Sequence, residues 1–233
     1  MENHTGNNNR FRTVVLSILI LFCLVIVSYT GYRLWASSQL NNQLLAQDKQ
    51  KIDVQGFPYL GSKDAPITIV EYGDYRCYYC RLFFNNVLEN KKIQGLIKSG
   101  EIKFIYKDFP FLSEDSKRSA IYLRGVYDHF GTDSYWKMHD MLYQNQTKDK
   151  KIKNYFTEDR LSQYASETLG KSKTQQLRET FQNKQYSSFT DKSYLDGEKH
   201  GVDGTPAVFI NGHLILKEPW DVDNIFKAIE LIK

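Results

Sequence analysis

The stretch ITIVEYGDYRCYYCRLF (residues 67–83) decides the fold, because a run of β-branched residues ends in a short polar loop that opens onto Cys77 and Cys80. The run predicts a buried strand, and the cysteine pair predicts the first turn of a helix. There, unsatisfied backbone N–H groups and the positive end of the helix dipole favour the thiolate of the leading cysteine. Two sulfurs on one helical turn also close a small ring that reopens easily. The pattern therefore indicates thiol–disulfide exchange.

Metal binding and a purely structural disulfide are the alternatives for this pair. A zinc site would need two further ligands, and the five histidines include no close His-x-x-x-His pair. A disulfide that closes so short a loop removes little entropy from the unfolded chain. We therefore predict no metal ion and no cofactor, while copper handling stays open because distant ligands can converge in space.

The N-terminus carries an apolar segment with no charged residue from 13 to 32, bracketed by Arg12 and Arg33. About 20 helical residues span the core of a bilayer. Residues 36–38 resemble a cleavage site only loosely, so we predict an uncleaved signal anchor, with cleavage and release of the domain as the alternative. Cys23 is expected to be one more apolar residue of the span. The predicted organisation is a cytoplasmic tail (1–12), a transmembrane anchor (13–35), a linker (36–55) and one folded domain (56–233).

The charge distribution gives little information about orientation, because the cationic residues on the two sides of the anchor nearly balance. A tail too short to fold, and a reactive cysteine pair without structural thiols, favour a domain on the extracytoplasmic face of the cell membrane. The net charge of +4 is too small to indicate nucleic-acid binding.

The domain is expected to alternate strands and helices at both ends and to be helical in between. A helix over 77–97 follows the first strand, and the alternating segment 101–106 predicts a second strand, parallel to the first. Residues 114–199 contain no convincing strand and predict several helices, with breaks at Gly131 and 144–154. The last unit is a strand (207–210), a turn at Asn211-Gly212, a strand (213–216) and a helix (220–232).

This order, with the phrases SKDAPITIVEYGDYRCYYC, IKFIYKDFP and GVDGTPAVFING, resembles the DsbA-like branch of the thioredoxin superfamily, and most of all its Gram-positive BdbD type, over residues 56–233. The resemblance implies an α/β thioredoxin fold with a helical domain inserted at about 112–200. It makes Cys77 the exposed nucleophile and Cys80 the buried resolving thiol, in agreement with their order on the helix. Tyr78-Tyr79 departs from the Pro-His of strongly oxidising members, which puts strong oxidising character in doubt.

Three further site residues follow from the resemblance. Glu71 matches the family's buried acidic residue, which passes protons to or from the resolving thiol; a solvent-facing glutamate at the end of a strand is the alternative. Pro206 stands where the superfamily has a cis-proline, and the backbone of Thr205 can there pair with an extended substrate segment. We expect Lys107 to lie on the surface and His139 to be a half-buried histidine without a catalytic role.

These residues predict an enzyme, a thiol–disulfide oxidoreductase that introduces disulfides into exported proteins with free thiols. With no second cysteine pair as an internal relay, the chain needs an external redox partner, and the resemblance implies a quinone-linked membrane protein of the DsbB type. Residues 36–55 look too short for the dimerisation domain of an isomerase, so we expect a monomer held at the membrane by lipid contacts of its anchor. A disulfide isomerase, a reductase, a redox-inert module and a copper-handling module stay open.

Overall fold

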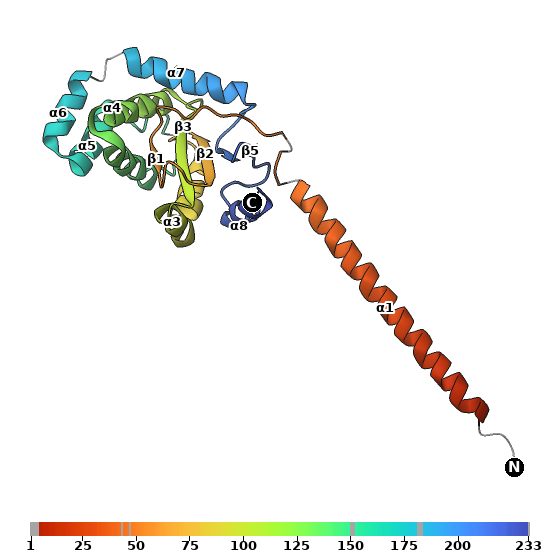
Figure 1. Cartoon of the computed structure of the whole chain (residues 1–233). Coiled ribbons are helices and arrows are strands. Elements are labelled where there is room, and N and C mark those ends of the chain that lie inside the picture. Colours follow the sequence, from red (N-terminus) through yellow and green to blue (C-terminus); the bar gives the residue numbers. More distant parts are fainter. Residues whose placement is uncertain (1–4, 43, 47, 150–151, 181–183, 233) are drawn as a thin grey trace. The chain divides into compact units, whose positions relative to one another are not determined.

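The computed structural model describes residues 5–232 except 43, 47, 150–151 and 181–183 (Figure 1). The chain divides into two units, one ending at Gln43 and the other beginning at Leu44. The first unit contains α1 (Thr5–Asn42), and its part Arg12–Ala36 is long and apolar enough to cross a membrane. The predicted anchor at 13–35 coincides with that part, and the helix continues beyond it into the expected linker.

The second unit is built on a five-stranded mixed sheet in the order β1-β3-β2-β4-β5. The central strand β2 (Ile67–Gly73) pairs in parallel with β3 (Ile102–Asp108) and antiparallel with β4 (Ala207–Ile210). The edges are β1 (Tyr59–Leu60) and β5 (His213–Leu214). The four predicted strands are present, with ends within two residues of those expected. Strand β1 was not predicted, because two residues carry no periodicity.

The two faces of the sheet are covered by different elements, as the alternation of side chains along a strand requires. Ile69 and Phe104 belong to the larger core, which also contains both cysteines of the pair. Val70, Tyr72 and Ile105 face a smaller core on the opposite side. Glu71 therefore shares the face of Ile69 and lies on the side of the cysteine helix.

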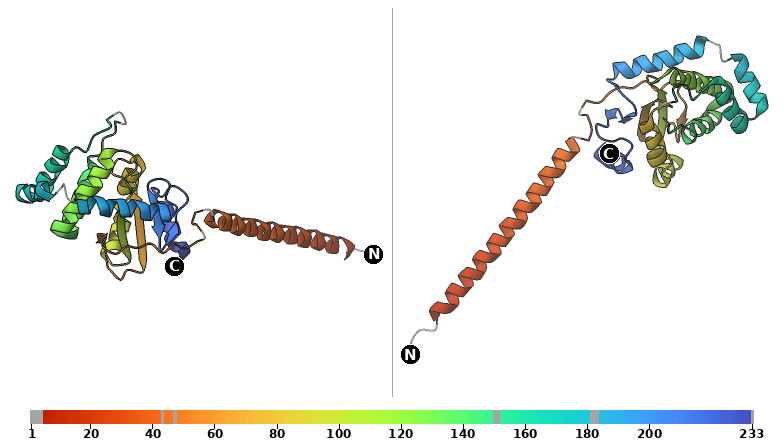
Figure 2. Two further views of the ribbon diagram at one scale, coloured as in Figure 1. Left: turned by 90° about the horizontal axis from the view of Figure 1, so that it is seen from above. Right: turned by 180° about the vertical axis from the view of Figure 1, so that it is seen from behind.

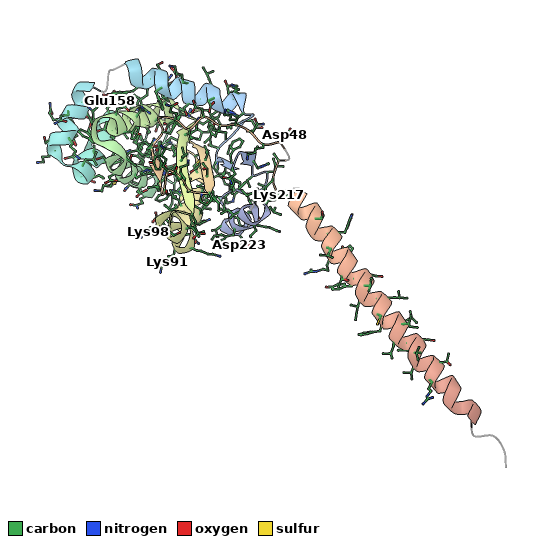
Figure 3. The ribbon with its side chains drawn as sticks, viewed as in Figure 1. Asp48, Lys91, Lys98, Glu158, Lys217 and Asp223 are labelled. Carbon is green, nitrogen blue, oxygen red and sulfur yellow. The ribbon has the colours of Figure 1, made fainter. Side chains whose placement is uncertain are left out.

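The predicted single helix over 77–97 is wrong, because the segment breaks into three pieces. These are α2 (Tyr78–Phe83), a π-helical turn η1 (Phe84–Leu88) and α3 (Lys91–Lys98). Asn90 causes the second break: its backbone is extended, and its side chain accepts hydrogen bonds from the N–H groups of Lys92 and Ile93, which begins a new helix. Lys91 and Lys98 of α3 are exposed (Figure 3).

The predicted helical block consists of α4 (Glu114–Gln144), α5 (Glu158–Leu169), α6 (Lys171–Thr180) and α7 (Lys184–Lys199), and these helices gather beside the sheet (Figure 2). The expected break at Gly131 is present inside α4, where this residue has φ +76°. Residues 145–149 and 152–157 connect α4 to α5, and 150–151 lie outside the described residues. Helix α8 (Val222–Ile232) ends the fold.

The folded unit starts earlier than the expected boundary at residue 56. Leu44 is buried in the larger core, and Leu45 forms a β-bridge with Ile215. The N–H groups of Ala46 and Gln50 donate to carbonyl oxygens of the β4–β5 hairpin region. The part of the predicted linker that begins at Leu44 is therefore attached to the domain by packing and hydrogen bonds.

Candidate active site

Cys77 and Cys80 lie where the central strand ends and α2 begins. Cys77 is the N-cap of α2, with an extended backbone, and its N–H donates to the carbonyl oxygen of Asp74 at 2.9 Å. Cys80 lies in the first turn and is 0% exposed. Cys77 is 6% exposed, which corrects the expected exposed nucleophile, because the loop that contains Thr205 packs against its sulfur. Both cysteines are free thiols in this structure.

The pKa values of the two thiols are shifted in opposite directions. The pKa of Cys77 is lowered to about 6, chiefly by the hydrogen bond from the thiol of Cys80 and further by Thr205 and backbone N–H groups of α2, which outweigh its burial. Burial raises the pKa of Cys80 well above its ordinary value, and the neighbouring Cys77 raises it further. At neutral pH the site therefore holds one thiolate, on Cys77, beside a protonated Cys80.

Glu71 is buried on the side of the sheet that carries the cysteines, so the alternative of a solvent-facing side chain is wrong. It is 1% exposed, and its Oε1 atom has no hydrogen-bond partner among the described residues. Burial raises the pKa of this carboxyl well above its usual range, the charge of Cys77 raises it further, and a hydrogen bond with Cys80 opposes them. A carboxyl group that can hold a proton thus lies next to the resolving thiol.

The proline loop reaches the leading cysteine directly. The Thr205–Pro206 peptide bond is cis, as the resemblance implied. When it is protonated, the Cys77 thiol donates to the carbonyl oxygen of Thr205, with Sγ and oxygen 3.1 Å apart. The Thr205 hydroxyl is buried and is used by no other group in the described part of the chain, so it is available to donate to the Cys77 thiolate, whose pKa it lowers. The structure therefore brings Glu71, both cysteines and the proline loop together.

Asp74, which sequence reasoning missed, fixes the loop before Cys77. Its Oδ1 atom accepts from the N–H of Arg76 at 2.7 Å, and its Oδ2 atom accepts from the N–H groups of Phe111 and Leu112 at 3.1 and 3.2 Å. The carboxylate thus connects the cysteine loop to the loop after β3. An aspartate two residues before a chain reversal is the usual signal of such a turn.

Gln146 fixes the same loop from the helical block and was also missed. Its Nε2 atom donates to the carbonyl oxygens of Tyr75 at 2.7 Å and Cys77 at 2.9 Å. Arg81 of α2 donates in turn to the carbonyl oxygen of Gln146 at 3.0 Å. No motif marks a glutamine that lies 69 positions from its partner Cys77.

His139 is fully buried rather than half-buried. Its Nδ1 atom is 3.0 Å from the Tyr75 hydroxyl, and burial lowers its pKa to about 3, so the ring is neutral. Aromatic rings surround it, from Tyr75, Phe84, Tyr106, Tyr135, Trp136 and Tyr143. Because Tyr75 belongs to the loop before Cys77, this aromatic cluster packs against that loop and supports it.

Lys107 is buried, so the predicted surface position is wrong. The side chain is 1% exposed, and its Nζ atom forms an ion pair with Asp196 at 2.5 Å and donates to the carbonyl oxygen of Asp53 at 2.6 Å. Asp196 also accepts from the Tyr72 hydroxyl at 2.6 Å. The lysine lies on the sheet face opposite Glu71 and serves to attach α7 and the N-terminal segment to the sheet.

A pocket of about 570 Å³ opens beside Cys77. Tyr78, Tyr79 and Leu112 form an exposed apolar part of its lining, and Tyr79 stacks on Trp220 with ring centroids 4.4 Å apart. Among the described residues, no group of three or more His, Cys, Asp or Glu side chains is arranged to hold a metal ion. Its volume lies within the range of about 300–1,000 Å³ that is typical of ligand-binding pockets.

Comparison with known proteins agrees with this geometry. The model of the Thioredoxin family matches residues 54–230. The probable disulfide bond formation protein D of Bacillus cereus is 30% identical over 217 residues, which are 93% of each chain. Disulfide bond formation protein D of Bacillus subtilis is 30% identical over 178 residues, 76% of this chain and 77% of the relative.

Solved structures show the same similarity. The crystal structure of oxidised BdbD from Bacillus subtilis superposes with a TM-score of 0.71 at 29% identity, and covers 82% of this chain and 98% of that one. DsbA from Chlamydia trachomatis shares the fold, with a TM-score of 0.67 at 22% identity over 79% of this chain and 96% of that one. The chain therefore belongs to the Thioredoxin family and, within it, to the DsbA-like disulfide bond formation proteins of the D type.

Proposed function

We propose that this chain oxidises exported proteins through a disulfide between Cys77 and Cys80. A client thiolate attacks the Sγ atom of Cys77, the bond between the two cysteines breaks, and Cys80 leaves and takes up a proton. A second client thiolate then attacks the client sulfur of the mixed disulfide, which releases Cys77 as a thiolate. Two electrons pass from the client to the enzyme, and the client gains a disulfide.

The observation that carries the proposal is the low pKa of Cys77, at about 6. A thiolate of low pKa is a good leaving group, so the mixed disulfide at Cys77 is resolved quickly by a second client thiol. The same stabilisation favours the reduced enzyme, and a stable reduced form makes its disulfide a strong oxidant. Tyr78 and Tyr79 offer no imidazole, so the hydrogen bonds from Cys80, Thr205 and backbone N–H groups of α2 supply the stabilisation that a histidine gives in other members.

Glu71 serves as the proton donor and acceptor for Cys80. Cys80 has a strongly raised pKa, so it leaves the disulfide as an unstable buried thiolate and needs a proton at once. Glu71 is protonated over a wider pH range than an exposed glutamate, because burial raises its pKa, and it lies within hydrogen-bond reach of Cys80. Proton transfer by a positioned carboxyl group speeds such a step.

Thr205 and Pro206 form the substrate-binding loop. The Thr205 backbone lies against the sulfur of Cys77 and before the strand β4, so a client segment in extended conformation can add a short strand there. Main-chain pairing does not depend on client side chains, which suits an enzyme with many clients.

The protein acts outside the cytoplasm as a monomer, held by the anchor Arg12–Ala36 in the cell membrane. Each turnover leaves the two cysteines reduced, so a membrane partner of the DsbB type, linked to quinone, reoxidises them. The length and apolar character of α1 support this location, and the chemistry of the reaction supports the need for a partner.

The reduction potential of the cysteine pair tests the proposal. The full chain in non-ionic detergent is equilibrated with glutathione buffers, and the thiols are counted by alkylation. A value near the strong-oxidant level of about −120 mV is expected, and a value near the thioredoxin level of about −270 mV would contradict an oxidase and indicate a reductase. In a Cys80→Ser variant, mixed disulfides with clients should accumulate, and Cys77→Ser should abolish them.

A further inference from the structure

The connection between α4 and α5 forms one wall of the pocket beside Cys77. It is attached to the cysteine loop near both of its ends. Gln146 donates to the carbonyl oxygens of Tyr75 and Cys77, and the guanidinium group of Arg76 donates to the carbonyl oxygen of Ile152. Lys148 lies between these two attachments and Lys153 directly follows the second, and both line the pocket.

Two lysines of this connection, Lys148 and Lys153, line the pocket and are exposed. Within the described part of the chain, neither ammonium group forms an ion pair with a carboxylate. The third cation of the lining, Arg76, already pairs with Asp115 at 3.3 Å. Asp149 is the single acidic residue among the lining residues described. Among the lining residues that this connection contributes, Lys148 and Lys153 outnumber Asp149, so this wall carries a net positive charge.

We propose that this pocket prefers client segments that carry Asp or Glu within a few residues of the reacting cysteine. The inference rests on the proposed function, since the pocket opens onto Cys77 and the client cysteine must reach that sulfur. Lys148 and Lys153 would attract the client carboxylate, while Tyr78, Tyr79 and Leu112 would contact neighbouring apolar side chains. Client choice would then depend on charge next to the cysteine as well as on backbone pairing at Thr205.

The size of the effect follows from the exposure of the two lysines. Exposed charge pairs interact weakly in water, and they act mainly on the rate of encounter. We expect an acidic client to be oxidised about two to five times faster than an uncharged one at low salt. Because exposed charges are screened within about 10 Å at 0.1 M salt, the preference should disappear near 0.5 M.

The test uses the full chain in non-ionic detergent, with its cysteine pair oxidised. Three dithiol peptides share one sequence and differ only at the two positions that flank the first cysteine, which are Glu, Gln or Lys. The second-order rate of peptide oxidation is measured by stopped-flow fluorescence at low and high salt. The order Glu, then Gln, then Lys is expected at low salt. Equal rates for the three peptides at low salt would overturn the proposal.

Matched variants locate the effect in the pocket. The double variant Lys148→Glu with Lys153→Glu should reverse the order of the charged peptides, so that the Lys peptide is oxidised faster than the Glu peptide. The control Lys91→Glu with Lys98→Glu makes the same charge change on the exposed surface of α3, away from the pocket lining, and should keep the order (Figure 3). An unchanged order in the pocket variant, or a reversal in the control, would refute the proposal.

A second readout separates this inference from the proposed function. Versions of the three peptides with serine in place of cysteine are titrated against the full chain by fluorescence anisotropy, which requires no redox chemistry. Tighter binding of the Glu peptide, lost in the pocket variant, supports the acidic preference. If no dithiol peptide is oxidised, the redox function is contradicted, and the anisotropy order still decides the preference.

Discussion

The Sγ atom of Cys77 lies 3.1 Å from the carbonyl oxygen of Thr205, although 128 positions separate the two residues in the chain. Strand β4, which follows the proline loop, pairs with β2, which precedes the cysteine loop, and this pairing brings the two loops to one end of the sheet. The buried Thr205 hydroxyl is thereby placed beside the sulfur whose pKa it lowers. The acidity of Cys77 thus depends on a residue from the other end of the domain.

Thr205→Val should make Cys77 less acidic, because valine has nearly the shape of threonine and lacks the hydroxyl. A hydrogen bond to a charged group contributes roughly 1.5 kcal/mol, so we expect about sevenfold less thiolate at pH 6. Thr205→Ser keeps the hydroxyl and should keep the pKa of Cys77 at about 6. Thiolate absorbance at 240 nm, followed against pH in the reduced protein, measures the change. Identical titrations of the valine and serine variants would disprove the role of the hydroxyl.

Glu71→Gln should slow disulfide exchange at Cys80, because glutamine fills the site but cannot exchange a proton. General acid–base catalysis contributes a factor of about 10² or more, so a loss of at least tenfold in the single-turnover rate is a conservative expectation. The loss should vary with pH, because proton supply to Cys80 then depends on water. The exposed Glu230→Gln is the matched control and should leave the rate and its pH profile unchanged. Equal profiles for Glu71→Gln and the unsubstituted chain would contradict the relay.

The same substitution should change how stability depends on pH. The pKa of Glu71 is raised in the folded protein, so the folded state binds more protons than the unfolded state above the ordinary glutamate pKa. The free energy of unfolding therefore falls as pH rises from that value through the folded pKa. Glu71→Gln removes this term and should be more stable than the unsubstituted chain at pH 8, on the order of 1 kcal/mol. Urea unfolding of the reduced proteins at pH 5 and pH 8 measures the difference.

Contiguous motifs allowed the sequence to predict the central strand and the cysteine pair, and the family resemblance that those motifs carry implied the buried acid and the proline loop. Each lies within a few residues of its own signal: Glu71 on the strand that leads to Cys77, and Pro206 just before an apolar strand. The break before α3 also had a local signal, because Asn90 is a favoured N-cap, but the periodicity of the apolar residues continued across it. Local signals and the resemblance therefore predicted the positions of these residues well, and local signals predicted the end of the cysteine helix poorly.

Lys107 and Gln146 could not have been placed from the sequence. A lysine is rarely buried, and the partner that permits its burial, Asp196, lies 89 positions away in α7. Gln146 belongs to a polar stretch that looks like an ordinary surface connection. Their positions depend on how the helical block packs against the sheet, and the hydrophobic pattern of a single sequence does not determine that packing.

Lys107→Met should destabilise the domain, because it leaves the partly buried carboxylate of Asp196 without its ion-pair partner. Removing one partner of a buried pair costs about 3 kcal/mol. The double variant Lys107→Met with Asp196→Leu should recover part of the loss, because no unpaired charge remains. Lys103→Met, on the same strand but only half-buried, is the control and should cost much less. Urea unfolding by tryptophan fluorescence measures all three, and equal losses for the two lysine variants would be inconsistent with a buried ion pair.

Gln146→Leu should loosen the loop that carries Cys77 without unfolding the domain. Leucine removes both Nε2 hydrogen bonds and leaves the Tyr75 carbonyl oxygen buried without its donor. Such a loss costs about 2 kcal/mol, which corresponds to about 30-fold faster hydrogen exchange if the loop opens locally. Mass spectrometry of peptides that cover residues 74–80 measures the rate, and peptides from α8 report whether the whole fold has changed. Gln144→Leu, at an exposed position one residue before the connection, is the matched control.

Because Gln146 also holds the wall that carries Lys148 and Lys153, the leucine variant should lose charge selectivity together with loop protection. Faster exchange with unchanged selectivity would show that the wall is held in place by the contact of Arg76 with Ile152 alone.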